Sequence, residues 1–371
     1  MSAPRVRVAI VGGGLSGLFA AHRLQSLGER DWVLFEARPR LGGRILSAPV
    51  DAKGAAATEA MNRFDLGPTW FWPEMQPELD EAVAGLGLAR FAQFDAGDLL
   101  LERSPREPVQ RLGGCASSPA SMRLVGGMAS LIDALASRLP VGQLRTGHVV
   151  RELRRTGPHA ELLVQGPGDQ PLAWQAEHVL LALPPRLAAH RLVFSPALPA
   201  PLLAQWQATP TWMAPHAKCL AVFDAPFWRE QGLSGQARSA RGPMVEIHDA
   251  SMPGGSAALF GFVGVPAHVR HGLSPEALQA HCQAQFVRLF GEAAAHPRAL
   301  FVKDWAADPF TATPADLNAS GHHAPAPVSH AADGPWAGCL TGIASEWSPQ
   351  FPGYVAGAVE AARLGVGGLR A

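Results

Sequence analysis

Hydrophobic runs of two different periods alternate along the first part of the chain. Residues 5–11 (RVRVAIV) form a short β-rich run that ends in glycines, which is typical of a buried parallel strand. Residues 15–27 carry apolar side chains at helical spacing and stop at Gly28, and residues 32–35 repeat the strand pattern. This order predicts a βαβ unit at the start of the chain.

The pattern changes in the middle of the chain and returns to the first type at the end. It predicts helices at residues 78–90, 129–139, 275–290 and 354–364, and strands at 149–153, 161–164, 178–183, 217–223, 259–265 and 340–343. We therefore expect an α/β protein with two domains. A Rossmann-like nucleotide-binding domain would comprise residues 1–75, 121–200 and 331–371. An α+β substrate-binding domain on an antiparallel sheet, residues 76–120 and 201–330, would be inserted into it.

Composition narrows the class of protein without naming a ligand. The formal net charge of the 371 residues is zero, so neither a nucleic-acid partner nor an anionic membrane partner is expected. Four scattered cysteines, without a CxxC pair, argue against a zinc site and a disulfide scaffold, and fit a cytoplasmic protein. The N-terminal apolar run leads straight into glycines and is expected to be a strand, not a secretory signal. We expect a monomer or homodimer.

A glycine-rich turn follows the first predicted strand. Gly12, Gly14 and Gly17 satisfy the pattern G-x-G-x-x-G and open the first predicted helix. Such glycines permit a tight turn and bring backbone N–H groups close to a pyrophosphate, whose charge suits a helix N-terminus. Glu36 comes 19 residues after Gly17, at the end of the second strand, where a carboxylate can accept hydrogen bonds from ribose hydroxyl groups.

A second glycine turn distinguishes between two dinucleotides. NAD and FAD both fit the first turn, but Gly42, Gly43 and Arg44 follow Glu36 almost directly. A long, buried dinucleotide needs more anchors than one βαβ unit supplies, so this second turn favours FAD. The alternative is an ordinary basic turn at the surface.

Together with later segments, these motifs resemble those of the flavin-containing amine oxidase superfamily. VAIVGGGLSGL, FEARPRLGGR, DLGPTW, VGGM, VLLALPP, KCLAVFDAPFW, DWAADPF and SEWSPQFPGYVAGAVEAA occur in that family's order along nearly the whole chain. The resemblance implies that FAD removes a hydride from the α-carbon of a small-molecule amine. The imine then hydrolyses to an aldehyde, and O2 is reduced to hydrogen peroxide.

The resemblance also assigns residues to parts of the cofactor. Glycines of the first turn, Glu36, Arg38 and Arg44 would hold the ADP half, Val149 would contact adenine, and the last predicted helix would point at the flavin N1–O2 edge. The full set expected at the cofactor is Gly12, Gly14, Leu15, Ser16, Gly17, Glu36, Ala37, Arg38, Gly42, Gly43, Arg44, Gly67, Pro68, Thr69, Trp70, Val149, Trp305, Ser345, Glu346 and Val355.

Two residues are expected at the reacting end. Lys218 is one of only three lysines and begins an otherwise apolar strand; the resemblance implies that it holds a water near flavin N5. The alternative is an edge-strand lysine that reaches solvent. Tyr354, the only tyrosine, corresponds to one wall of an aromatic cage at the flavin in monoamine oxidases. The alternative is a core aromatic residue whose hydroxyl group caps a helix.

The sequence departs from the family pattern at the second wall of that cage. The position falls near Pro314 and Ala315, which are not aromatic, and Pro314 replaces the cysteine that binds flavin covalently in mammalian monoamine oxidases. We therefore expect non-covalent FAD, and a cage that is half-open or completed by another aromatic side chain. The candidates for that side chain are Phe310, Trp70, Trp72 and Phe351.

Several alternatives remain open from the sequence. An L-amino-acid oxidase would need an arginine for the substrate carboxylate, and Arg63, Arg123 and Arg241 are candidates by residue type only. A desaturase-like enzyme of the same superfamily and a non-catalytic flavoprotein are also possible. The His/Pro-rich stretch at residues 320–330 is expected to be a surface loop and not a metal site.

Overall fold

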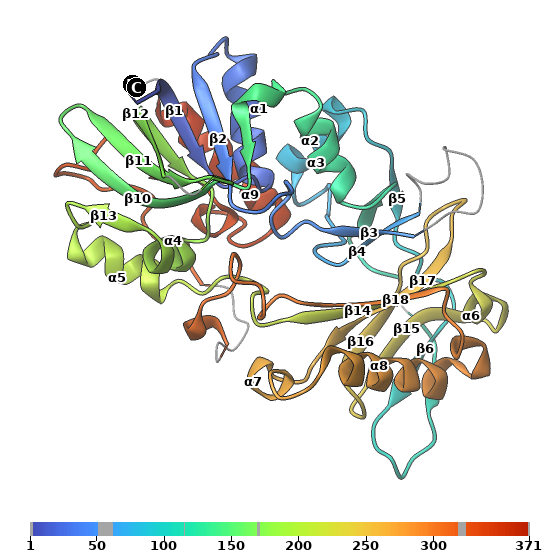
Figure 1. Ribbon diagram of the computed structural model, residues 1–371. Helices are drawn as coiled ribbons and strands as arrows, with labels where there is room; N and C mark the ends of the chain where they lie inside the picture. The colour runs from blue at the N-terminus through green and yellow to red at the C-terminus, as the bar shows by residue number, and fades with distance from the viewer. Residues whose placement is uncertain (1–2, 51–61, 115, 169–170, 318–323, 370–371) are drawn as a thin grey trace. The chain divides into compact units, whose positions relative to one another are not determined.

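The computed structural model describes residues 3–50, 62–114, 116–168, 171–317 and 324–369 (Figure 1). The chain divides into two compact units, the first of residues 1–44, 131–212 and 309–371, the second of residues 45–130 and 213–308. Residues 45–75 and 121–130, which the sequence pattern assigns to the nucleotide-binding domain, group with the second unit. Residues 201–212 and 309–330 group with the first.

The first unit is built on a mixed sheet whose centre is parallel. Strand β1 (Arg5–Val11) pairs in parallel with β2 (Trp32–Glu36) and with β12 (Leu172–Leu181). β2 pairs onward with β9 (Leu144–Thr146), and β12 pairs with β19 (Leu340–Gly342). The antiparallel strands β10 (Val149–Thr156) and β11 (His159–Gln165) extend the sheet to β13 (Val193–Ser195).

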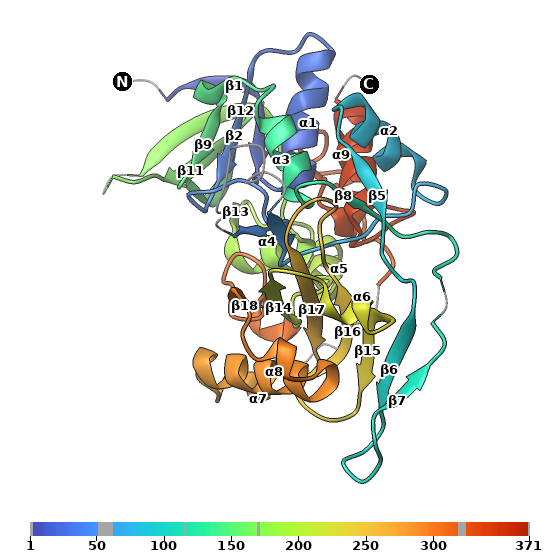
Figure 2. The same ribbon diagram turned by 90° about the vertical axis from the view of Figure 1, so that its right-hand side faces the viewer.

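Two helices from opposite ends of the chain lie side by side in this unit. They are α1 (Leu15–Ser26) and α9 (Val355–Gly368), as both views show (Figures 1 and 2). The apolar face of α1 buries Leu18, Ala21 and Leu24. All five residues of β2 are buried, as expected for a parallel strand with both faces covered. The first βαβ unit and the last helix therefore belong to one compact unit.

The second unit is built on a seven-stranded sheet. Its order is β18 (Ala299–Asp304), β14 (Ala217–Phe223), β17 (Ala257–Val263), β16 (Met244–Asp249), β15 (Leu233–Ser239), β6 (Asp98–Glu102) and β7 (Gln110–Leu112). Neighbouring strands are antiparallel except β15 and β6, which are parallel. Helix α8 (Pro275–Phe290) packs on this sheet (Figure 2), and its N-cap Ser274 accepts a hydrogen bond from the Ala277 N–H.

The remaining elements are short. They are β3 (Ser47–Pro49), β4 (Arg63–Asp65), α2 (Pro77–Gly85), β5 (Arg90–Ala92), β8 (Met122–Leu124), α3 (Ala129–Ala136), η1 (Val141–Gln143), α4 (Pro185–Arg191), α5 (Ala200–Ala208), α6 (Phe227–Glu230), α7 (Ala267–Arg270), η2 (Glu292–Ala294), η3 (Pro314–Asp316) and η4 (Ser345–Trp347).

The expected α/β fold with a Rossmann-like unit is confirmed, and several element boundaries differ. The strand at residues 217–223 and the helix at 275–290 have the predicted bounds. The helix expected to reach residue 90 ends at Gly85, two residues before Gly87, which has a φ of 74°. β15 was not predicted because its sequence, LSGQARS, lacks the β-branched and aromatic residues that mark a strand.

No helix among the described residues is long and apolar enough to cross a bilayer. Nor does the described part of the chain bring three or more His, Cys, Asp or Glu side chains together as metal ligands. Residues 320–323 of the His/Pro-rich stretch lie outside the described residues, as does Cys115.

Candidate functional site

The first glycine turn is shaped by two glycines that the fold itself requires. Gly12 has a φ of 112°, and a Cβ atom there would lie 2.7 Å from the Ala182 carbonyl oxygen. A Cβ atom on Gly17 would lie 2.0 Å from the Gly12 carbonyl oxygen. Both positions therefore demand glycine because backbone approaches backbone closely, whether or not a ligand is bound.

Gly14 differs from Gly12 and Gly17, because the space beside it decides whether a dinucleotide fits the turn. Its backbone is extended, with a φ of −75°, and a Cβ atom there would meet no protein atom closer than 3.9 Å. Gly14 is also the N-cap of α1, which has no side-chain cap, and Leu15 and Ser16 form the first turn of the helix. The space beside Gly14 and the uncapped helix N-terminus together fit a pyrophosphate.

Glu36 is held in place by backbone N–H groups on both sides. Its Oε2 accepts a hydrogen bond from the Gly13 N–H at 2.7 Å, and its Oε1 accepts one from the Arg38 N–H at 2.8 Å. Each oxygen keeps a further lone pair for a ribose hydroxyl group. The His148 N–H donates to the Glu36 backbone carbonyl oxygen at 2.8 Å, which brings the start of β10, and so Val149, next to the end of β2.

The two glycine turns lie directly against each other. The Gly42 N–H donates to the Gly13 carbonyl oxygen at 2.8 Å, and Gly14 and Gly42 form a parallel bridge. Gly43 has a φ of 56°, and a Cβ atom there would lie 3.2 Å from Gly14 Cα. The FEARPRLGGR segment therefore returns to the first turn, and together the two turns form one continuous backbone surface.

Arg44 connects this surface to the segment that precedes the last helix. Its guanidinium donates to both carboxylate oxygens of Glu346, at 2.5 and 3.0 Å, and to Ser345 Oγ at 3.1 Å. It also donates to the Trp212 carbonyl oxygen at 3.2 Å. The Glu346 side chain is only 3% exposed. A two-bonded pair of this kind fixes the orientation of both side chains.

Arg38 and Ala37 lie at the end of β2 in the same unit. The Arg38 side chain donates to Thr311 Oγ1 at 3.1 Å and stacks on the Phe310 ring, with 5.3 Å from Cζ to the ring centroid. Ala37 is half-buried. Phe310, one of the aromatic residues considered for the second cage wall, is thus in contact with the arginine expected at the cofactor.

Tyr354 is the N-cap residue of α9, directly before Val355. Its side chain makes no capping hydrogen bond and the residue is 38% exposed. It is therefore not a core aromatic residue that caps a helix. Its ring is tilted by 31° from the Trp212 ring, with 6.5 Å between the ring centroids. At the position expected for the other cage wall, Pro314 begins the short helix η3 and is exposed.

Lys218 is buried in the second unit, on a central strand. β14 is paired on both sides, with β17 and β18, and Lys218 is 3% exposed, so an edge-strand lysine that reaches solvent is excluded. The ammonium group donates to Thr69 Oγ1 at 2.6 Å and to the Gly67 carbonyl oxygen at 3.1 Å. It also lies 3.8 Å from the centroid of the Phe260 ring.

Burial lowers the pKa of Lys218 to about 7, despite the opposing attraction of Asp65. Nearby Arg123 lowers it further. Burial also raises the pKa of Asp65, and the positive charge of Lys218 opposes this rise. Both directions follow from the cost of charge in a dry interior. A lysine that titrates near neutral pH, next to the DLGPTW loop, can change its charge during a reaction.

The loop from Gly67 through Pro68 and Thr69 to Trp70 is held by aromatic residues. Trp305, 5% exposed, donates its indole N–H to the Leu66 carbonyl oxygen at 3.0 Å. The Trp70 ring packs on Phe260, with 5.3 Å between centroids, and its N–H donates to Gln93 Oε1 at 2.7 Å. The contacts of Trp70 and Trp305, both in the second unit, therefore hold this loop in place.

Sequence reasoning missed Asp65, Phe260, Phe262 and Trp212. The two phenylalanines could have been found from the alternation LFGFV in a strand next to the lysine strand, because Lys218 and Phe262 are register partners. Asp65 and Trp212 carry no such signal, because their partners are distant in the chain.

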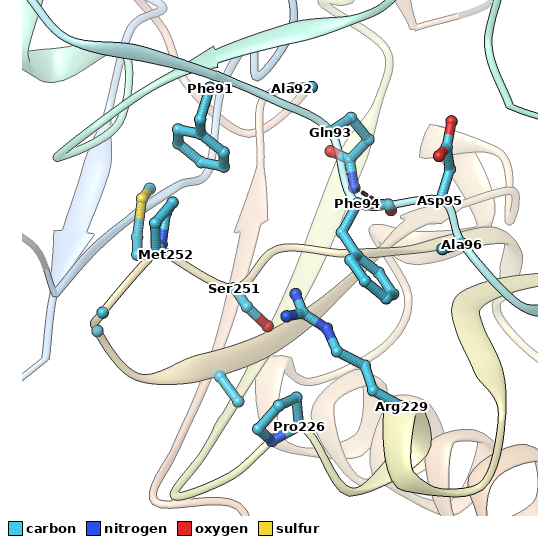
Figure 3. Close-up of a pocket in the computed structure, with 14 residues that line it drawn as sticks. Phe91, Ala92, Gln93, Phe94, Asp95, Ala96, Pro226, Arg229, Ser251 and Met252 are labelled. Carbon is cyan, nitrogen blue, oxygen red and sulfur yellow. Dashed lines mark hydrogen bonds between the residues drawn. The ribbon is translucent and has the colours of Figure 1, made fainter.

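A cavity of about 530 Å³ lies in the second unit, and Gln93, the hydrogen-bond partner of Trp70, is one of its lining residues (Figure 3). Phe91, Phe94, Met252 and Arg229 are among its lining residues. Arg229 pairs with the buried Asp249 at 2.8 Å and stacks on Phe94 at 3.8 Å. Its charge is thus balanced within the protein, and the cavity is lined by both apolar and polar side chains.

Comparisons with known proteins agree on one family. Residues 111–366 match the family described as flavin containing amine oxidoreductase, and residues 10–86 match the NAD(P)-binding Rossmann-like domain. Putrescine oxidase of Kocuria rosea is 25% identical, over 82% of this chain and 83% of that protein. "Probable flavin-containing monoamine oxidase A" of Dictyostelium discoideum is 28% identical over 64% of this chain and 51% of that protein. The chain thus spans about half the length of the latter relative.

Solved structures show the same fold. Putrescine oxidase bound to putrescine matches with a TM-score of 0.77 at 20% identity, over 99% of both chains. Cyclohexylamine oxidase from Brevibacterium oxydans matches with a TM-score of 0.78 at 19% identity, also over 99% of both chains.

Proposed function

Because the chain belongs to the flavin containing amine oxidoreductase family, we propose that it is an FAD-dependent amine oxidase. The proposed reaction converts a primary or secondary amine to an imine, which hydrolyses to an aldehyde, and reduces O2 to hydrogen peroxide. Bound flavin would supply the hydride acceptance and the electron transfer to oxygen. The protein side chains bind and orient the reactants and tune their charges.

The residues of the first unit support FAD as the dinucleotide. Glu36 would accept hydrogen bonds from the ribose, and the free space at Gly14 would take the pyrophosphate. The second turn, from Gly42 to Arg44, extends this backbone surface toward Ser345 and Glu346. An extended flavin dinucleotide needs a longer binding surface than one βαβ unit supplies. We infer that the FAD is held without a covalent bond, because proline occupies position 314.

The environment of Lys218 is the observation that carries the oxidase proposal. A buried lysine costs free energy unless it has partners, and this one has a hydroxyl group, a carbonyl group and an aromatic face. With a pKa of about 7 it can hold a water molecule as a donor and still change charge near neutral pH. We propose that it assists hydride transfer and the later reaction with oxygen.

The surroundings of two of the three candidate arginines favour an amine without a carboxylate group. The guanidinium of Arg123 is buried and donates to the carbonyl oxygens of Ser251 and Ala250, at 3.0 and 2.8 Å. Arg241 lies 3.8 Å from the Glu102 carboxylate. These two are thus engaged by the protein itself. The names putrescine oxidase and cyclohexylamine oxidase among the similar proteins point to the same class of substrate.

An absorption spectrum of the purified protein, before and after anaerobic addition of amines, tests the proposal. We expect a flavin spectrum that is bleached by at least one simple monoamine or diamine, and peroxide release when air is admitted. An L-amino-acid panel run in parallel distinguishes an amino-acid oxidase.

Two outcomes would favour other functions. A flavin that dithionite bleaches but no amine or amino acid does would indicate a non-catalytic flavoprotein or a desaturase-like enzyme. Reduction by an amine without peroxide release would show a different electron acceptor.

A further inference from the structure

Trp212 is held more tightly than its place in an irregular segment suggests. The N–H of the preceding Thr211 donates to Asp316 Oδ1 at 3.1 Å, and the Trp212 carbonyl oxygen accepts from Arg44. Asp316 is fully buried and also pairs with Arg186 at 2.6 Å. The backbone on both sides of the tryptophan side chain is therefore fixed by charged groups.

The next residue has an unusual backbone conformation. Met213 has a φ of 61°, and among the described residues it is the only non-glycine residue with a positive φ. This conformation is unfavourable for a residue with a side chain and persists only where the surroundings impose it. The backbone directly after Trp212 is therefore also restricted to one conformation.

The Trp212 side chain packs on the backbone directly before Tyr354. Gly353 has a φ of 83°, and a Cβ atom there would lie 2.6 Å from Trp212 Cβ and 2.9 Å from Trp212 Cγ. Glycine is therefore required at 353 so that the tryptophan can approach. The approach brings the Trp212 ring to within 6.5 Å of the Tyr354 ring, centroid to centroid.

Hydrogen bonds that do not involve Trp212 also hold the loop that carries Tyr354. The Gly353 N–H donates to the Ser345 carbonyl oxygen at 3.0 Å. The buried Glu360 of α9 accepts hydrogen bonds from the Ser348 hydroxyl group and the Gln350 N–H. These contacts fix the backbone of the loop. The Trp212 ring lies beside the Tyr354 side chain that this loop carries.

We propose that Trp212 is a positioning residue for Tyr354 and thereby a determinant of amine specificity. Arg44 holds Trp212 and the cofactor-side carboxylate Glu346 at once, so the orientation of Tyr354 is coupled to the segment expected at the flavin. The inference rests on the proposed function, because it assumes that Tyr354 contacts the amine. The substrates affected are amines with an apolar group large enough to reach an aromatic ring.

The test uses flavin-loaded Trp212→Leu and Trp212→Phe, with Trp174→Leu as the matched control. Trp174 is also half-buried in the first unit and has one aromatic partner, Phe35, at 5.4 Å. The probes are benzylamine and α,α-dimethylbenzylamine. The second has no α-hydrogen, so it cannot be oxidised, and its binding is read from the change in flavin absorbance without turnover.

We expect Trp212→Leu to weaken binding of the non-oxidisable probe by at least fivefold, and to raise the benzylamine concentration for half-maximal anaerobic reduction by a similar factor. Trp212→Phe, which keeps a flat ring, should remain within twofold of the wild type, as should Trp174→Leu. Flavin content should be unchanged in all three variants.

A double-mutant cycle with Tyr354→Leu decides whether Trp212 acts through the tyrosine. If it does, Trp212→Leu should have no further effect on probe binding once Tyr354 is removed. Additive losses, or loss of flavin from both Trp212 variants, would overturn the inference while leaving the oxidase proposal intact. If the wild-type flavin is neither reduced by amines nor perturbed by the non-oxidisable probe, the proposed function itself is wrong, and the inference fails with it.

Discussion

Arg44 and Glu346 form a two-bonded ion pair that joins the second glycine turn to the segment before the last helix. The carboxylate is the more buried partner, with 3% of its side chain exposed against 25% for the arginine. Removal of either side chain leaves the charge of the other without its counter-ion in a poorly solvated environment. The two halves of the pair should therefore not be equivalent.

We expect Arg44→Met to cost about 3–5 kcal/mol of stability, because it leaves a buried carboxylate uncompensated. Glu346→Gln should cost less, since the more exposed Arg44 keeps its bonds to Ser345 and Trp212. Urea unfolding and flavin retention measure both effects. Arg154→Met, which breaks an exposed pair with Glu152, is the control and should change neither quantity. If Arg154→Met lost as much stability and flavin as Arg44→Met, the importance given to the Arg44–Glu346 pair would be contradicted.

Lys218 should give the oxidative half-reaction a pH dependence near neutrality. Burial lowers its pKa from 10.5 to about 7, so it is an ammonium group below that pH and a neutral amine above it. If the positive charge speeds the reaction of reduced enzyme with oxygen, the rate should fall as the pH rises through about 7. Stopped-flow mixing with oxygenated buffer measures this rate.

Lys218→Met should react slowly with oxygen, at a rate that does not vary across this pH range. Lys303→Met is the matched control, because Lys303 is the register partner of Lys218 on β18 and pairs with Asp308 at 3.0 Å. It should retain the pH dependence. If Lys218→Met showed the wild-type pH profile, another group would have to be responsible.

Gly14 and Gly17 should respond differently to the same substitution. Gly14→Ala adds a methyl group where no protein atom lies within 3.9 Å, so the stability of the flavin-free protein should change by less than about 0.5 kcal/mol. Flavin affinity should fall at least tenfold, because the methyl group enters the space proposed for the pyrophosphate. Equilibrium titration with FAD and thermal unfolding separate the two quantities.

Gly17→Ala should instead destabilise the fold by about 1–3 kcal/mol or more, since its methyl group would meet the Gly12 carbonyl oxygen at 2.0 Å. The effect should be seen without any flavin present. Equal flavin affinity for Gly14→Ala and the wild type would show that the pyrophosphate lies elsewhere.

The flavin should be released when the protein is denatured. The family resemblance implies that Pro314 stands at the position of the cysteine that binds flavin covalently in mammalian monoamine oxidases, and a proline side chain offers no nucleophile. Acid precipitation should leave all of the flavin in the supernatant, and chromatography should identify it as FAD. Yellow colour retained in the precipitate, or release of FMN, would contradict the proposal.

The sequence alone determined the elements whose signals are local. The run RVRVAIV, the glycines that follow it and the helical spacing of residues 15–27 predicted the βαβ unit, because period and turn chemistry are properties of neighbouring residues. Lys218 and Tyr354 were singled out by their rarity and by family resemblance. Glu36 was placed by its spacing from the glycines.

Only the tertiary structure decided how these residues are held. Gly13 meets Glu36, and Gly42 meets Gly13, only because the chain folds back on itself. Trp212 reaches the Gly353 backbone although the two residues are 141 positions apart in the sequence. The pKa of Lys218 depends on burial by strands that the sequence places far apart. Sequence period records which face of an element is apolar, whereas distances, burial and charge depend on which elements pack together.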